Sequence, residues 1–271
     1  MKIRKITVFL FLLVISEGAD AEDMYKFSNI PPSGREVAVL ILAPGMNANG
    51  SLFLKEVEWT TFAWENNLGI IALNYSSSEI DLYRNRRGYY YPEQGSGKAL
   101  LDEIKNIYKK DLPILLYGFS GGAQFISRFV NWVPERIIAW CAYSAQFWDY
   151  PHTGMKITDA RGIVACGDLD AFRWKPSFDF YYQGRKNRMN WIWVNISNTG
   201  HNRNNEFEQF VRDFFDEELK IYLGEKKPGR DVYANIFSTS GQTSKNFYFT
   251  ELSCPFRTWK LLNLWKKIQA P

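Results

Sequence analysis

Short apolar runs alternate with segments of helical length along most of the chain. Each run is nearly continuous in Val, Ile, Leu, Ala or aromatic residues, as expected for strands covered on both faces. The runs span residues 36–43, 68–75, 112–118, 136–143, 161–166 and 191–197. We expect helices between and after them, at residues 52–67, 93–110, 121–133, 172–187 and 204–223. This alternation predicts an α/β fold with a mostly parallel central sheet and helices on both faces.

The composition excludes several classes of protein. An apolar fraction of 46% and an aromatic fraction of 17% supply a sizeable core and exclude a mainly disordered chain. The net charge of +4 comes without a clustered basic stripe, so we expect no nucleic-acid partner. Two His and three Cys without close spacing make a zinc site of those ligands improbable. The chain has no phosphate-binding glycine motif, and we expect no cofactor and no metal.

The pentapeptide Gly118-Phe119-Ser120-Gly121-Gly122 joins an expected strand to an expected helix. A Gly-x-Ser-x-Gly sequence at such a junction is typical of a nucleophile elbow, a turn so tight that flanking side chains would clash. The pattern alone also fits an ordinary turn, because Gly and Ser are common there. The strand before it and the helix after it favour the elbow, with Ser120 as nucleophile.

Candidate acids and a candidate base follow Ser120, each directly after an expected strand. The run at 161–166 leads to Asp168 and Asp170, and the run at 191–197 leads to His201. The only other histidine, His152, precedes both acids in the chain. We therefore assign His152 to a solvated loop, with a substrate contact as the less favoured alternative, and predict that His201 is the base.

This order of Ser, acid and His at strand ends resembles the α/β-hydrolase superfamily over about residues 36–223. The chain looks most like secreted lidless serine esterases, such as polyhydroxybutyrate depolymerases, feruloyl esterases and polyester hydrolases. In this superfamily the acid usually takes the last place of a Gly-x-x-Asp loop, which implies Asp170. Asp168 is the competing candidate, and its alternative role is that of a turn residue.

The resemblance also implies an oxyanion hole built from two backbone amides. One amide belongs to Gly121, the residue after the nucleophile. The other belongs to Met46, which follows a Pro44-Gly45 pair where the superfamily more often has His-Gly. Alternatively, residues 45–50 are only a flexible connection.

Substrate recognition is less constrained by the sequence. Only residues 144–160 separate two expected strands at the usual place of a lid, so we expect an open cleft without a large helical lid. Phe119, beside the nucleophile, and Trp148, after a strand end, are candidate substrate-binding residues, and Phe147 and Tyr150 lie near Trp148. In a chain with 10 Trp, 15 Tyr and 20 Phe residues, however, some aromatic side chains must fall near any site.

The first residues have the layout of a secretory signal peptide. Lys2, Arg4 and Lys5 precede an apolar stretch at 6–15 that is too short to span a bilayer, and Ala19-Asp20-Ala21 offers small residues for cleavage. We expect cleavage after Ala21 and a secreted or periplasmic product without a stable membrane span. Residues 22–224 would form the hydrolase domain, and residues 225–271 a C-terminal extension packed on it.

The cysteines fit more than one interpretation. Cys141 and Cys166 lie in expected strands, and Cys254 lies near the C-terminus. A bridge between Cys141 and Cys166 is possible, but the sequence does not decide it.

These residues predict a serine hydrolase that cleaves carboxylic esters through an acyl-enzyme, with a small-molecule or polymeric ester as substrate. The same fold and residues also fit a serine peptidase or an acyltransferase. A catalytically silent binding protein is the alternative from another class. The sequence leaves the oligomeric state open.

Overall fold

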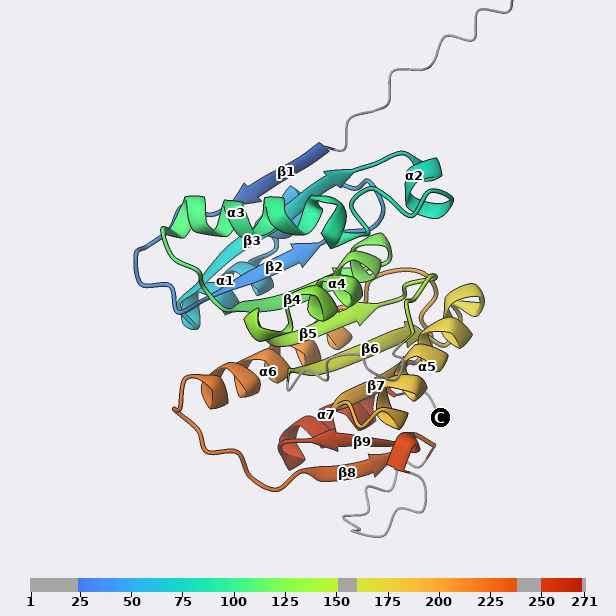
Figure 1. Ribbon diagram of the computed structural model, residues 1–271. Helices are drawn as coiled ribbons and strands as arrows, with labels where there is room; N and C mark the ends of the chain where they lie inside the picture. Colours follow the sequence, from blue (N-terminus) through green and yellow to red (C-terminus); the bar gives the residue numbers. More distant parts are fainter. Residues whose placement is uncertain (1–23, 151–159, 238–249, 270–271) are drawn as a thin grey trace, which may run out of the picture.

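A seven-stranded sheet forms the centre of the computed structural model of this chain, which describes residues 24–150, 160–237 and 250–269. The strand order is β1-β3-β2-β4-β5-β6-β7 (Figure 1). Neighbours from β2 to β7 pair in parallel, and β1 pairs antiparallel with β3 at one edge. The strands are β1 (Met24–Asn29), β2 (Ala38–Ala43), β3 (Leu68–Ser76), β4 (Ile114–Phe119), β5 (Ile137–Tyr143), β6 (Arg161–Gly167) and β7 (Trp191–Ile196).

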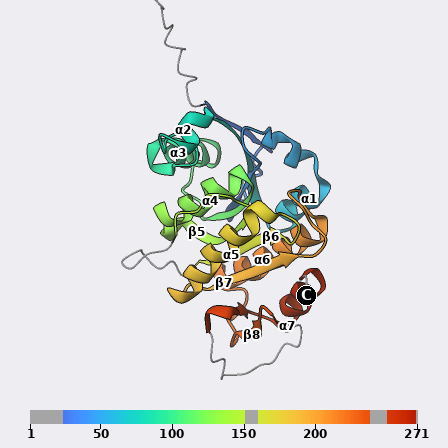
Figure 2. The same ribbon diagram turned by 90° about the vertical axis from the view of Figure 1, so that its right-hand side faces the viewer.

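Helices cover both faces of the sheet, which confirms the predicted α/β architecture. Figure 2 shows α3, α4 and α5 on one face and α1 and α6 on the other. The helices are α1 (Val57–Glu65), α2 (Glu79–Tyr83), α3 (Ser96–Tyr108), α4 (Gly121–Trp132), α5 (Ala171–Lys186), α6 (Asn205–Tyr222) and α7 (Trp259–Ile268). Short 3₁₀ turns are η1 (Gly50–Lys55), η2 (Pro92–Gln94), η3 (Pro134–Arg136) and η4 (Thr250–Leu252). Among the described helices, none has both the length and the apolar character that a membrane span requires.

All six predicted strands form, with ends that shift by at most two residues. Their apolar runs are continuous because both faces are covered; every residue of β2, for example, is buried. Two expected helices are shorter than predicted. The first is divided at Glu56, whose extended backbone separates η1 from α1, and the second begins only after Gly95, where φ is 122°. The predicted leader at residues 1–21 and His152 lie outside the described residues.

The strand register bears on the cysteines. Cys141 in β5 lies opposite Ile163 in β6. Ile163 is three residues before Cys166, so Cys141 and Cys166 are offset by roughly 10 Å along the strands. A disulfide needs Cα atoms within about 7 Å, so the register excludes a Cys141–Cys166 bridge. All three cysteines are free and buried.

The last part of the chain packs along β7, the outer strand of the sheet (Figure 1). It forms a two-stranded antiparallel ribbon of β8 (Val232–Asn235) and β9 (Ser253–Phe256), followed by α7. The Trp265 indole donates to the Trp193 carbonyl at 2.7 Å, and the Ser197 amide donates to the Ile268 carbonyl at 3.1 Å. These contacts cover an edge that would otherwise expose unpaired backbone groups.

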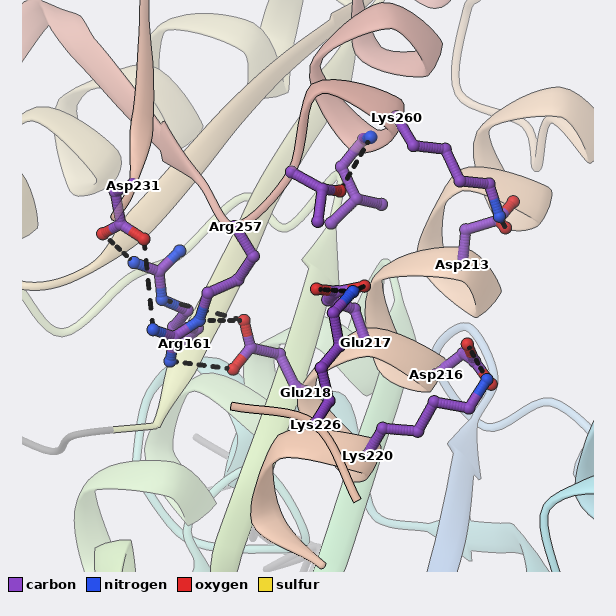
Figure 3. Close-up of polar contacts among 12 residues, drawn as sticks. Arg161, Asp213, Asp216, Glu217, Glu218, Lys220, Lys226, Asp231, Arg257 and Lys260 are labelled. Carbon is purple, nitrogen blue, oxygen red and sulfur yellow. Dashed lines mark hydrogen bonds and ion pairs between the residues drawn. The ribbon is translucent and has the colours of Figure 1, made fainter. Parts of the chain in front are cut away.

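A cluster of buried and partly buried charges joins this segment to the domain (Figure 3). Arg161, at the start of β6, forms ion pairs with Glu218 of α6 and with Asp231 before β8. Arg257, after β9, donates to both Glu218 oxygens at 3.1 and 3.3 Å. Burial raises the pKa of Glu218, against the lowering effects of Arg257 and Arg161. Two guanidinium and two carboxyl groups thus come together where three segments meet.

Candidate active site

Ser120 lies at a sharp turn between β4 and α4, with φ 54° and ψ −115°. This strained conformation is rare for a residue with a side chain and marks sites where the surroundings enforce it. The neighbouring glycines allow the turn. A Cβ on Gly118 would come within 2.7 Å of the Gly122 carbonyl group, and a Cβ on Gly122 would overlap the carbonyl of Ala43. The geometry is that of a nucleophile elbow.

The structure brings Ser120, His201 and Asp170 into one hydrogen-bonded chain. His201 Nε2 lies 3.0 Å from Ser120 Oγ, and His201 Nδ1 lies 2.8 Å from Asp170 Oδ2. The Asp170 side chain is only 3% exposed, whereas that of His201 is 32% exposed. A carboxylate that accepts Nδ1–H leaves the Nε2 lone pair facing the serine hydroxyl, which is the arrangement a general base requires.

The two candidate acids occupy different places in the loop after β6. Asp168 Oδ1 accepts a hydrogen bond from the Thr199 amide at 3.0 Å, so this side chain fastens the loop that follows β7. Asp170 is the carboxylate that contacts His201, and its second oxygen accepts a hydrogen bond from Arg173 at 3.1 Å. Both Asp170 oxygens therefore have partners, which fixes the orientation of the carboxylate. Sequence reasoning missed Arg173; a cation three residues after an acid at the start of a helix was the available signal.

The amides of Met46 and Gly121 lie close together beside Ser120. A Cβ built on Gly121 would lie 2.7 Å from both the N and the Cα of Met46, and one built on Gly45 would lie 3.9 Å from the Ser120 Cβ. Neither amide donates to another residue in the described part of the chain. The Asn47 side chain donates to the Ser77 carbonyl at 3.0 Å and accepts from the Ser77 amide at 3.2 Å. The loop is thus held firmly rather than being a loose connection.

The two predicted aromatic contacts have different surroundings. Phe119 stacks on the His201 ring, with centroids 5.0 Å apart and planes 24° apart, so it borders the site. Trp148 is 7% exposed, stacks on Phe180 at 4.3 Å and donates to the Ala145 carbonyl. This burial corrects the expectation that Trp148 lines an open cleft. Its neighbour Phe147 is instead exposed.

Two exposed aromatic residues pack on each other, and one of them contacts the Met46 side chain. Phe147 is 46% exposed and its ring lies 5.3 Å from that of Tyr83. The Tyr83 hydroxyl in turn lies 3.1 Å from Met46 Sδ. No cluster of three or more His, Cys, Asp or Glu side chains suited to a metal ion occurs among the described residues.

Comparison with known proteins identifies the fold. No family model and no curated protein sequence matches the chain. Among solved structures, the esterase PE8 is similar, with a TM-score of 0.56 at 18% identity, over 71% of this chain and 98% of that one. A poly(3-hydroxybutyrate) depolymerase from Bordetella parapertussis gives a TM-score of 0.51 at 14% identity, over 76% of this chain and 85% of that one.

A third similar structure is a fluorophosphonate-binding serine hydrolase from Staphylococcus aureus. Its TM-score is 0.51 at 11% identity, over 73% of this chain and 98% of that one. At such identities the similarity defines the fold alone. The chain has the α/β-hydrolase fold and resembles esterases, depolymerases and other serine hydrolases in its architecture.

Proposed function

We propose that this protein is a secreted serine hydrolase that cleaves carboxylic esters through an acyl-enzyme. The observation that carries the proposal is the hydrogen-bonded chain Ser120–His201–Asp170, with the serine at a strained turn between strand and helix. Strain of this kind is kept where function requires it. The esterases among the structural neighbours support the same reaction class.

In this mechanism Ser120 Oγ attacks the ester carbonyl while His201 Nε2 takes the hydroxyl proton. Asp170 holds the imidazole in the required tautomer and stabilises its protonated form. The amides of Met46 and Gly121 donate to the tetrahedral oxyanion, and each such donor is typically worth about 3 kcal/mol in the barrier. His201 returns the proton to the leaving alcohol, and water then hydrolyses the acyl-enzyme.

The proposed substrate is a small-molecule or polymeric ester. The Phe119 ring stacks on His201, and Tyr83 contacts both the Met46 side chain and the Phe147 ring. Aromatic side chains at these places suit an uncharged ester. We further propose that residues 1–21 are a signal peptide removed after Ala21. The mature chain would then comprise a hydrolase domain at 22–224 and an extension at 225–271.

The proposal is tested by treating the mature protein, from Glu22 on, with a fluorophosphonate and measuring its intact mass. We expect one stoichiometric adduct in the parent and none in Ser120→Ala, whose fold is checked by circular dichroism. Folded parent protein that forms no adduct would overturn the proposal in favour of a catalytically silent binding protein. Turnover of soluble esters, with peptides and alcohol acceptors assayed alongside, then distinguishes an esterase from a peptidase or an acyltransferase.

A further inference from the structure

We infer that Arg203, clamped between Glu56 and Glu208, is a positioning residue for His201, an inference that rests on the proposed function. Arg203 follows His201 by two residues and belongs to the loop that connects β7 to α6. Its guanidinium bonds to two carboxylates from separate elements. We call Arg203, Glu56 and Glu208 together the clamp. It holds this loop close to β4, the strand that ends directly before Ser120.

Glu208 is the buried centre of the clamp. It lies in the first turn of α6 and is only 2% exposed. Its oxygens accept hydrogen bonds from Arg203 Nε and Nη2 at 2.5 and 2.6 Å. They also accept from the Tyr117 hydroxyl at 2.6 Å and the Trp59 indole at 3.3 Å. A buried carboxylate with four donors has a single defined orientation.

Arg203 is held as tightly as Glu208. Its Nη1 and Nη2 donate to the two Glu56 oxygens at 2.7 and 2.6 Å, a bidentate pair. The guanidinium carbon also lies 4.2 Å from the centroid of the Phe53 ring. Burial by itself would lower the pKa of Arg203, but the hydrogen bonds to Glu56 and Glu208 raise it overall. The side chain therefore remains a cation with a fixed position.

The clamp links the strand that precedes Ser120 to the loop that carries His201. Tyr117 precedes Ser120 by three residues on β4, so Glu208 connects that strand to the loop that carries His201. The imidazole itself contacts Ser120, Asp170 and the Phe119 ring, and about a third of it is exposed. The clamp therefore acts on the position of the His201 imidazole through the backbone of the loop that carries it. A second contact on the same loop is the hydrogen bond from the Tyr143 hydroxyl to the Asn202 carbonyl, at 2.5 Å.

Stability alone does not account for such a cluster. Buried ion pairs can often be replaced by apolar groups of similar volume at little or no cost in stability. Their better attested effect is to select one arrangement among alternatives. A clamp that fixes the loop of the general base would act on the rate of the chemical step, because misplacement by about 1 Å can cost on the order of 100-fold.

The test is the double variant Arg203→Met/Glu208→Gln, which removes both charges of the Arg203–Glu208 pair together. The buried Arg212, which lies near Glu208, keeps Glu58 and Asp213 as opposing charges. The remaining partner, Glu56, is about 30% exposed, so water can reach its carboxyl group. The matched control is Arg257→Met/Glu218→Gln, which removes an equivalent arginine–glutamate pair from the cluster in Figure 3. Both are assayed with a soluble p-nitrophenyl ester at a temperature where circular dichroism reports folded protein.

We expect the Arg203/Glu208 variant to lose about 10- to 100-fold in kcat with KM changed by less than about threefold. The control should keep kcat within about twofold of the parent value. A folded Arg203/Glu208 variant with the parent kcat, or equal losses in both variants, would overturn the inference.

If the Arg203/Glu208 variant does not fold, Glu56→Gln replaces it. This variant removes only the more exposed pair, and a kcat equal to the parent value would again overturn the inference, whereas a loss of about threefold or more at unchanged KM would support it.

The inference and the proposed function can fail separately. A parent protein that neither forms the fluorophosphonate adduct nor turns over an ester overturns the function. An active parent with an equally active clamp variant overturns the role of Arg203 alone.

Discussion

Asp168 and Asp170 lie two positions apart in one loop, yet they bond to different partners. We expect Asp170→Asn to lower kcat by about 10⁴-fold, because an amide in place of the carboxylate favours the wrong imidazole tautomer. Asp168→Asn replaces a charged acceptor for the Thr199 amide by a neutral one. This change should cost about 1 kcal/mol of stability and little activity. Initial rates and thermal melts of both variants check this. A larger loss of kcat in Asp168→Asn would reverse the assignment.

The three thiols should be inert in the folded protein. Burial raises the pKa of Cys166 to about 12 and that of Cys254 to about 11, and it also raises the pKa of Cys141. At pH 8, which is below these values, the thiols stay protonated, and the thiolate is the reactive form. Ellman's reagent should label no cysteine in the native protein and three per chain in guanidinium chloride. Fast labelling of the native protein would contradict this, and fewer than three after unfolding would point to a disulfide.

Some residues were predictable because local sequence determines their position. A turn between strand and helix presents Ser120, and strand ends present Asp170 and His201, whatever surrounds them. Trp148 was placed wrongly because sequence cannot tell which of two adjacent aromatic residues turns inward. That choice depends on Phe180, which is distant in the chain. Arg203 was missed for the same reason, since its two carboxylate partners come from separate elements.

At the scale of elements, burial on both faces made the central strands easy to predict. The edge strand β1 was missed, because its residues are exposed or half-buried and its sequence mixes polar with apolar residues. The break between η1 and α1 was also missed. Glu56 is a reasonable helix residue by propensity, yet it takes an extended conformation at the break and pairs with Arg203. Tertiary contacts of this kind override local preference.

The C-terminal helix α7 should be an integral part of the folded unit. Trp265 is 1% exposed and bonds to the Trp193 carbonyl, so Trp265→Ala should cost about 3–5 kcal/mol in the free energy of unfolding. Trp259, on the same helix, is 49% exposed, and Trp259→Ala should change the free energy of unfolding by less than about 0.5 kcal/mol. Urea unfolding measures both values. If Trp265→Ala instead produced a separate transition at low urea and left the main transition unchanged, the C-terminal segment would unfold by itself.

At the scale of the whole molecule, the connection between β5 and β6 is the place where the sequence predicts no large lid. Its described part, residues 144–150, contains no helix and is fastened to the domain. Asp149 accepts hydrogen bonds from the buried Arg128 of α4 at 2.8 Å and from Arg86 at 2.9 Å. Trp148 adds its stacking on Phe180. A segment held at these points is poorly suited to swing open and closed over Ser120.

This arrangement predicts an enzyme without interfacial activation. Enzymes whose lid opens at a lipid surface gain activity when a sparingly soluble ester passes its solubility limit. Because the described part of the β5–β6 connection contains no helix and is anchored, we expect no such opening step, so the rate on p-nitrophenyl butyrate should follow a single hyperbola through that limit. Initial rates across the limit, with a lidded lipase as the positive control, make the comparison. An abrupt rise of about tenfold or more in this protein alongside the lipase would mean that a covering segment does move, and the anchored contacts of Asp149 would then be the first to examine by substitution.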